Sequence, residues 1–180
     1  LACQSLLAGE CDLALAGCST LKLPSDIGHT FEAGMPFSVD GHTRPFDQAA
    51  SGTVFGSGIG AVILKPVDLA MHDQDHIYAV IKGSAVNNDG RRRASFSAPG
   101  LDGQVAALEE ALDLSGMLKA KASIDYVEAH GTATAIGDQI EVAALTRAYA
   151  LAAGDPCYLG SVKSNIGHLS WSAGMAGLMK

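Results

Sequence analysis

Short apolar segments alternate along the chain with segments whose apolar residues recur at helical spacing. The short apolar runs predict strands over residues 13–17, 60–65, 77–83, 124–128 and 157–162, the first of them buried. Helical spacing predicts helices over residues 1–8, 67–71, 102–112, 140–151 and 173–180. This alternation is typical of a layered α/β fold with a largely parallel sheet, although the strands on either side of residues 66–76 could also pair antiparallel.

Residues 21–51 interrupt this pattern. They contain Pro24, Pro36, Pro45 and several glycines, and they are too polar and broken to form a core. We therefore expect a long irregular segment that runs over the surface on the active-site side.

Composition excludes several classes of protein. A chain of 180 residues that is 48% hydrophobic is long enough for one globular domain, which buries roughly 70% of its unfolded surface. The net charge is −7 and the single basic run is Arg91–Arg93, which argues against a nucleic-acid partner. No apolar run reaches the length of a membrane span and no signal peptide opens the chain, so we expect a cytoplasmic protein.

The four cysteines do not form a disulfide framework or a CxxC pair, so we expect buried, small apolar residues. Cys18 ends a predicted strand, but no His, Lys or Arg lies near it in sequence to activate it as a nucleophile. Both ends of the chain fall inside helical patterns, without a cap or an initiator Met. We therefore expect these residues to be a piece of a longer polypeptide.

Two Gly-rich turns carry the candidate chemistry. His130 lies in the first turn, and Lys163 and His168 lie in the second; each turn stands between a predicted strand and a predicted helix. Ligands of open α/β folds bind where strands end, and two imidazole N–H groups can stabilise one developing enolate oxygen. Each His could instead cap its own loop. That simpler interpretation is favoured for one isolated His, but two in matching turns favour catalysis.

Other motifs have simpler interpretations. Gly56–Gly60 has the spacing of a dinucleotide-binding loop, but a strand follows it instead of a helix, which favours close backbone packing. His72 and His76 have the spacing of a metal-binding pair, with Asp73 and Asp75 between them. Because this segment is polar and turn-like, a solvated loop is favoured and no metal is expected.

Five segments, in this order, resemble the β-ketoacyl synthase family within the thiolase-like superfamily: residues 44–47, 52–60, 83–90, 126–132 and 160–168. They are most similar to the ketosynthase domain of modular polyketide synthases and of multifunctional fatty acid synthases. The resemblance covers nearly the whole chain. It implies a layered α-β-α-β-α architecture, of which residues 1–180 cover the middle part: the end of the N-terminal half and the start of the C-terminal half, truncated at both ends.

The resemblance implies a decarboxylative Claisen condensation. In this family a cysteine accepts an acyl chain from an acyl carrier protein, and a malonyl or methylmalonyl group on a second phosphopantetheine loses carbon dioxide to form the attacking enolate. His130 and His168 correspond to the two family histidines that favour decarboxylation and hold the enolate oxygen. Lys163, Asp138 and Glu141 correspond to the polar network behind them, and Thr132 and Thr134 to residues that hold the pantetheine arm.

The resemblance also implies partners and missing parts. It implies an acyl carrier protein as partner, a homodimer in the full-length parent, and no directly bound cofactor. The nucleophilic Cys motif of the family would lie about nine residues before Leu1, and no cysteine of this chain matches it. The Gly-rich loop that completes the acyl oxyanion hole is not in the sequence. We therefore expect the 180-residue product to be inactive and poorly folded by itself. Arg91–Arg93 could contact the carrier protein, although a solvated loop is the simpler interpretation.

The chain departs locally from the family pattern, and two other functions stand as alternatives. Ala133 and Ala135 stand where Gly and Pro are commoner, and residues 170–172 (Ser-Trp-Ser) replace small residues, which predicts different packing behind His168. A non-elongating, decarboxylase-type ketosynthase and a catalytically silent scaffold subunit are the alternatives. The presence of both His130 and His168 argues against a scaffold, which has no need of two costly polar groups in one pocket. Acyl chain, extender unit and module are not predicted.

Overall fold

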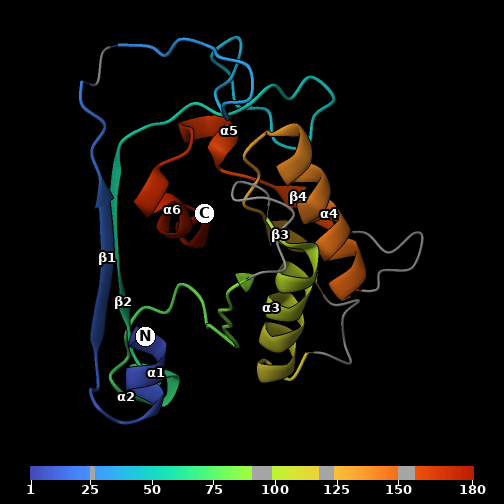
Figure 1. Cartoon of the computed structure of the whole chain (residues 1–180). Helices are drawn as coiled ribbons and strands as arrows, with labels where there is room; N and C mark the ends of the chain where they lie inside the picture. The colour runs from blue at the N-terminus through green and yellow to red at the C-terminus, as the bar shows by residue number, and fades with distance from the viewer. Residues whose placement is uncertain (25–26, 91–98, 118–123, 150–156) are drawn as a thin grey trace.

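The computed structural model describes residues 1–24, 27–90, 99–117, 124–149 and 157–180 (Figure 1). The elements are, in chain order, α1 (Ala2–Leu7), β1 (Ala14–Thr20), β2 (Gly58–Leu64), α2 (Val67–His72), α3 (Leu101–Leu114), β3 (Tyr126–Glu128), α4 (Ala135–Tyr149), β4 (Tyr158–Gly160), α5 (Lys163–Ile166), the short 3-10 helix η3 (Ser170–Ser172) and α6 (Ala173–Met179). The mixed α/β class is as predicted. Most predicted elements are present, with ends displaced by a few residues.

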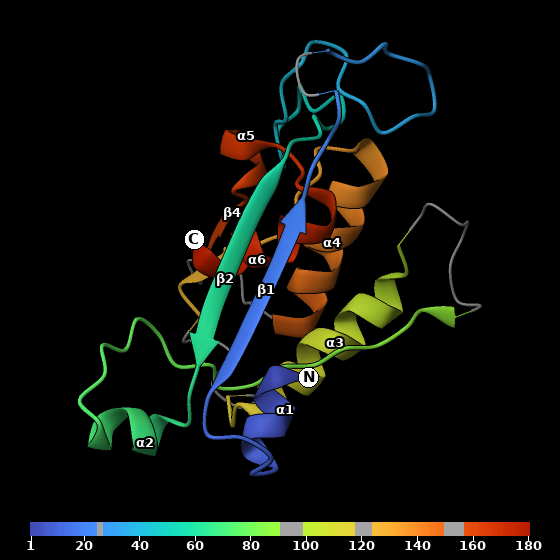
Figure 2. The ribbon, with the colours of Figure 1, turned by 90° about the vertical axis from the view of Figure 1, so that its left-hand side faces the viewer.

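β1 and β2 pair antiparallel, from Ala14 opposite Leu64 to Thr20 opposite Gly58. The sheet is therefore not largely parallel as predicted, because residues 21–57 return the chain to the end of the sheet where β1 finishes. The strand predicted over residues 13–17 is present as β1, but the prediction that it is buried is wrong. Side chains alternate between the two faces, so one face is half-buried while the other exposes Leu15, Ile59 and Ile63. Figure 2 shows this second face toward the viewer, with α4, α5 and α6 behind the sheet.

Residues 77–83 do not form the predicted strand. A strand needs a neighbour to share its backbone hydrogen bonds, and no described strand is paired with this segment. Tyr78 and Val80 are exposed instead. At Gly83 the segment runs so close to the end of α3 that a Cβ would collide with the carbonyl oxygen of Ala111.

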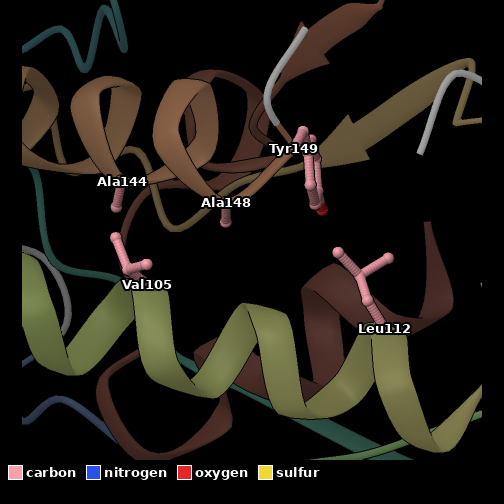
Figure 3. Packing of buried hydrophobic residues seen from close by; sticks show 5 residues of the cluster. All are labelled: Val105, Leu112, Ala144, Ala148 and Tyr149. Carbon is pink, nitrogen blue, oxygen red and sulfur yellow. The ribbon is translucent and has the colours of Figure 1, made fainter. Parts of the chain in front are cut away.

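The core of the second half lies between α3 and α4 (Figure 3). It consists of the buried residues Val105, Leu112, Ala144, Ala148 and Tyr149. The two alanines stand one turn apart on α4, and their small side chains let the helices approach closely. At the rim, Arg147 donates a hydrogen bond to Asp102 over 2.7 Å. Val127 of β3 packs against the same cluster, which fixes the short strand beside the helices.

β3 and β4 pair in parallel, with Tyr126 opposite Tyr158 and Glu128 opposite Gly160. Because the strands run in the same direction, their carboxyl ends meet at one edge. The chain leaves β3 toward α4, which begins at Ala135, five residues earlier than predicted, and leaves β4 toward α5. The predicted end of α4 at residues 150–151 lies outside the described residues. None of the helices in the described ranges is both long and apolar enough to cross a membrane.

Candidate active site

The two candidate histidines come together at the exits of β3 and β4. The ring centroids of His130 and His168 lie 5.4 Å apart, and the ring planes are nearly perpendicular at 88°. Two N–H groups that donate to one oxygen at about 2.9 Å each need nitrogens no more than about 5.8 Å apart. The 5.4 Å separates the ring centroids, and rings this close can each turn one nitrogen toward the same oxygen, so the pair is placed to serve a single oxygen atom.

The backbone around His168 is fixed by the segment before β2. The His168 N–H donates to the carbonyl of Val54 over 2.7 Å, and the Gly56 N–H donates to the carbonyl of His168 over 3.1 Å. Gly167 has a φ of 71°, and a Cβ there would lie 2.6 Å from the Val54 oxygen. Only glycine fits this close approach, which explains the Gly-His dipeptide.

One hydrogen bond determines which ring nitrogen of neutral His168 carries the proton. The backbone N–H of Ser170 donates to Nδ1 of His168 over 2.9 Å. Nδ1 therefore accepts, so in the neutral ring the proton is on Nε2. His168 thus offers an Nε2–H donor to a ligand, as an oxyanion-binding group must.

Phe55 supports the other side of the His168 ring. The two rings stack with centroids 5.1 Å apart and planes 26° apart. Phe37 contacts Phe55 edge-on at 5.7 Å, and His29 stacks on Phe37 at 5.1 Å. Ring contacts therefore connect His29 and Phe37, in the segment of residues 21–51, to His168. This agrees with the prediction that the segment lies on the active-site side.

For the decarboxylation that the family resemblance implies, we expect Phe55→Leu to lower the rate of carbon dioxide release from a malonyl thioester by up to about tenfold in the complete domain. A stacked aromatic pair contributes about 0.5–1.5 kcal/mol beyond burial, and leucine removes the stacking while it retains most of the apolar contact. Steady-state kinetics would measure this change. Phe31→Leu is the matched control, since Phe31 is 47% exposed. Equal rates for both variants would show that the stack does not position His168.

The loop of His130 is held by Glu141 of α4. One carboxylate oxygen accepts the backbone N–H of His130 at 2.5 Å, and the other accepts that of Gly131 at 2.8 Å. Gly131 has a φ of 46°, and a Cβ there would lie 2.6 Å from Cβ of Ser161. The loop therefore packs directly on the exit of β4, which brings the two histidine loops together. Burial raises the pKa of Glu141, and its two backbone hydrogen bonds oppose this rise.

Asp138 connects the same loop to a segment far away in sequence. It is 7% exposed, and its two oxygens accept the backbone N–H groups of Ala133 at 3.0 Å and of Phe46 at 2.7 Å. Ala133 is fully buried and has a φ of 59°, a conformation that costs a non-glycine residue about 1–2 kcal/mol. The Asp138 carboxylate stabilises the turn in which the family more commonly has glycine.

Thr132 and Thr134 lie side by side, with their hydroxyl oxygens 3.1 Å apart. Both residues are half-buried. A Cβ at Gly137 would collide with the Thr134 hydroxyl, so the absence of a side chain at Gly137 makes room for this hydroxyl group. The two hydroxyl groups are therefore adjacent and partly open to solvent.

Lys163 is the buried cation of the site, at 4% exposure. Within the described part of the chain, its ammonium group has no hydrogen bond or ion pair. Burial lowers the pKa of Lys163, while the negative charges of Glu141 and then Glu128 act in the opposite direction. Lys163 thus supplies positive charge close to the two histidines.

Both histidines favour the neutral form. Burial of the ring, followed by the charges of Lys163 and His168, lowers the pKa of His130 to about 4. Burial and the Lys163 charge also lower the pKa of His168. His130 as a residue is nevertheless exposed, so water on its open side weakens the effect of burial. The direction is the same for both rings: at pH 7 they are neutral hydrogen-bond donors.

We expect ¹⁵N-histidine NMR of the complete enzyme to show His168 titrating at lower pH than an ordinary histidine, with the proton of the neutral ring on Nε2. The pKa of an unperturbed histidine is about 6.5. In the folded state both pKa values are lowered, so the unfolded chain takes up protons first as the pH falls. The stability contributed by the neutral rings is therefore present above about pH 6.5 and is lost progressively toward pH 4. A charged His168 at pH 7 would contradict this assignment.

The remaining motifs have structural explanations. Gly56–Gly60 packs closely as expected: a Cβ at Gly58 would lie 2.6 Å from Cδ1 of Leu169. Asp73 and Asp75 both accept hydrogen bonds from Lys65, at 2.5 and 2.6 Å. No group of three potential metal ligands is found in the described ranges. Arg91–Arg93 lies outside them.

The segment behind His168 is tied to the first sheet. Ser172 is buried; its backbone N–H donates to the Thr20 hydroxyl at 3.1 Å and its own hydroxyl donates to the carbonyl of Gly58 at 3.2 Å. Trp171 is 88% exposed. The unusual residues 170–172 therefore attach this turn to β1 and β2, while the indole stays outside the packing.

Two residues of the site were not singled out from sequence, although both lie in motifs noted there. Phe55 looks like one more apolar residue before a strand, and Glu128 looks like the last residue of a strand. Their distinguishing signal is spatial, because each contacts residues more than 30 positions away.

Comparison with solved structures defines the class of protein: the fold is that of thiolase-like ketosynthase domains. Ketosynthase twelve of the bacillaene polyketide synthase of Bacillus amyloliquefaciens superposes with a TM-score of 0.94 at 41% identity, over 99% of this chain and 32% of that one. The ketosynthase of module 1 of the bacillaene synthase from strain FZB42 of the same species gives a TM-score of 0.90 at 44% identity, over 99% of this chain and 32% of that one.

The family follows from the sequence matches. Residues 1–70 match the N-terminal domain of β-ketoacyl synthase, and residues 78–180 match its C-terminal domain. The chain belongs to the β-ketoacyl synthase family, which confirms the resemblance found in the sequence. It is 50% identical to a phenolphthiocerol/phthiocerol polyketide synthase protein of Mycobacterium tuberculosis, over 100% of this chain and 12% of that protein. It is 42% identical to the polyketide synthase PksN of Bacillus subtilis, over 98% of this chain and 3% of that protein.

Proposed function

We propose that residues 1–180 are the middle part of a ketosynthase domain that carries out decarboxylative Claisen condensation in polyketide or fatty acid biosynthesis. The observation that carries this proposal is the 5.4 Å separation of the His130 and His168 rings at the exits of two parallel strands. Membership of the β-ketoacyl synthase family supports the same reaction. The substrates are a malonyl-type extender and an acyl thioester.

The two neutral imidazoles stabilise the enolate. When the malonyl C–C bond breaks, its electron pair moves into the thioester as an enolate and carbon dioxide leaves. Nε2–H of His168 and an N–H of His130 donate to the enolate oxygen without transferring a proton. The enolate carbon then attacks the acyl thioester, the new C–C bond forms, the C–S bond breaks and the thiolate leaves. The nearby Lys163 ammonium adds positive charge behind the developing anion.

The other residues hold this geometry and the substrate arm. Glu141 and Asp138 fix the His130 loop through its backbone N–H groups. The adjacent hydroxyl groups of Thr132 and Thr134 bind the phosphopantetheine arm, which presents amide groups that accept and donate hydrogen bonds. The substrates arrive on an acyl carrier protein, and the complete domain is a homodimer.

The acylated cysteine is supplied by residues outside this sequence. None of its cysteines (Cys3, Cys11, Cys18 and Cys157) lies on either histidine loop. Because none of them matches the nucleophile motif of the family, we propose that the 180-residue product is inactive in condensation by itself.

A two-step assay of the complete ketosynthase tests this function. The enzyme is first loaded with an acyl thioester and then supplied with malonyl-loaded acyl carrier protein. Carbon dioxide release and a β-ketoacyl product on the carrier, seen by mass spectrometry, are the expected results. The 180-residue product serves as the comparison and should give neither. Acyl loading without product or carbon dioxide would refute the proposed condensation.

A further inference from the structure

Glu128 joins the two loops that carry the candidate catalytic residues. It is the last residue of β3, two positions before His130. Its carboxylate reaches across to the exit of β4, where one oxygen accepts the backbone N–H of Val162 at 2.5 Å. Val162 immediately precedes Lys163. A single carboxylate therefore fastens the backbone before His130 to the backbone before Lys163.

The second oxygen of Glu128 is also held. It accepts the hydroxyl of Tyr126 at 2.5 Å and lies 3.4 Å from the ammonium nitrogen of Lys180. The side chain of Glu128 is 13% exposed, and α6 covers it closely enough that a Cβ at Gly177 would lie 3.5 Å from Cγ of Glu128. Residues from β3, from the β4 exit and from the end of α6 thus enclose one carboxylate.

The ionisation of Glu128 agrees with this enclosure. Burial acts to raise its pKa, but the hydrogen bonds from Tyr126 and Val162 and the charge of Lys180 outweigh it, and the net pKa is lowered. Glu128 is therefore ionised at neutral pH.

Lys163 needs such a charge nearby. Lys163 is a buried residue, and burial disfavours its charge unless negative groups compensate for the lost hydration. Among the described residues, the carboxylates of Glu141 on α4 and Glu128 on β3 act to raise the pKa of Lys163, and the Lys163 charge in turn acts on the neutral rings of His130 and His168. Glu141 accepts backbone hydrogen bonds from the His130 loop, and Glu128 accepts one from the residue before Lys163.

We propose that Glu128 is a positioning residue of the site, which fastens the His130 loop to the Lys163 loop and shares with Glu141 the negative charge opposite the Lys163 ammonium. This deepens the proposed function and rests on it for its catalytic meaning. The connection of the two loops by Glu128 depends only on the contacts of its carboxylate and not on the proposed function.

The test is Glu128→Gln in the complete ketosynthase, with the pH dependence of Lys163 reactivity as the first measurement. Competitive labelling of amines, read by mass spectrometry of the Lys163 peptide, gives the pH of half-maximal reactivity. We expect it to fall by about one pH unit, because glutamine fits the same space without the charge. The alkaline limb of the pH profile of carbon dioxide release should move in the same direction.

Two controls separate charge from structure. Tyr126→Phe removes one hydrogen bond to Glu128 but keeps its charge, so the Lys163 profile should remain as in the wild type. Asp102→Asn removes an exposed carboxylate, which pairs with Arg147 at the surface, and should change neither measurement. A folded Glu128→Gln enzyme with the wild-type Lys163 profile would overturn the proposal.

Failure to fold is covered by a second variant. Glu128→Asp keeps the charge but shortens the side chain, so it cannot hold Val162 and Tyr126 together. We expect kcat for carbon dioxide release to fall about tenfold with little change in KM, since misplacement of the loop affects the transition state most. Wild-type kcat in this variant would overturn the positioning role. If the wild-type enzyme releases no carbon dioxide, the proposed function fails, while the labelling of Lys163 still decides the role of Glu128.

Discussion

Replacement of His168 by alanine in the complete ketosynthase is expected to lower the rate of malonyl decarboxylation by about a hundredfold to a thousandfold. One preorganised donor to a developing oxyanion is typically worth that much, and the Nε2–H of His168 is oriented by the Ser170 contact and by the Phe55 stack. Release of labelled carbon dioxide from a malonyl thioester measures the effect. In the proposed mechanism the imidazoles act on the malonyl group, so acyl loading of the cysteine is expected to be spared.

His130→Ala is expected to cause a loss of similar size. The two effects should not multiply in the double variant, because in the proposed mechanism both rings donate to one oxygen and the second loss removes less than the first. His72→Ala is the matched control, since His72 is an exposed histidine at the end of α2. Carbon dioxide release unchanged in either single variant would eliminate the role assigned to that ring.

The sequence predicts the histidine loops well because their determinants are local. The strand before His130 pairs with the strand before Lys163, and parallel pairing alone brings the two exits to one edge. Gly131 and Gly167 both have positive φ. Glycine is the residue that adopts this conformation most readily, so its presence in the two motifs already indicates tight turns. The conformation of each histidine loop is therefore determined by local residues, and the parallel pairing of β3 and β4 brings the two loops together.

Features that depend on distant partners were harder to predict. Residues 77–83 have a strand-like composition, but composition does not tell whether a neighbouring strand is present. Phe55 is assigned a role only once His168, more than a hundred residues later, is seen stacked on it. The carboxylate of Glu128 looks like that of any strand-end glutamate until Val162 is placed opposite it.

Asp138→Ala is expected to destabilise the complete domain by about 3 kcal/mol. The substitution leaves the backbone N–H of Ala133, which is buried, and that of Phe46, which is partly buried, without their acceptor; a hydrogen bond to a charged group contributes about 1.5–3 kcal/mol. The strained turn at Ala133 also loses the contact that stabilises it. Urea unfolding followed by circular dichroism would measure the change as a lower midpoint.

Asp138→Asn should fall between wild type and alanine, because the amide oxygen can still accept one of the two N–H groups while its NH₂ group opposes the other. Glu110→Ala is the control: this glutamate is exposed on α3, and its loss should stay within about 0.5 kcal/mol. Because Phe46 is 92 residues from Asp138, the loss should also free the segment before β2 from the His130 loop. If the alanine variant unfolded at the wild-type midpoint, the Asp138 contacts would contribute nothing to holding that segment.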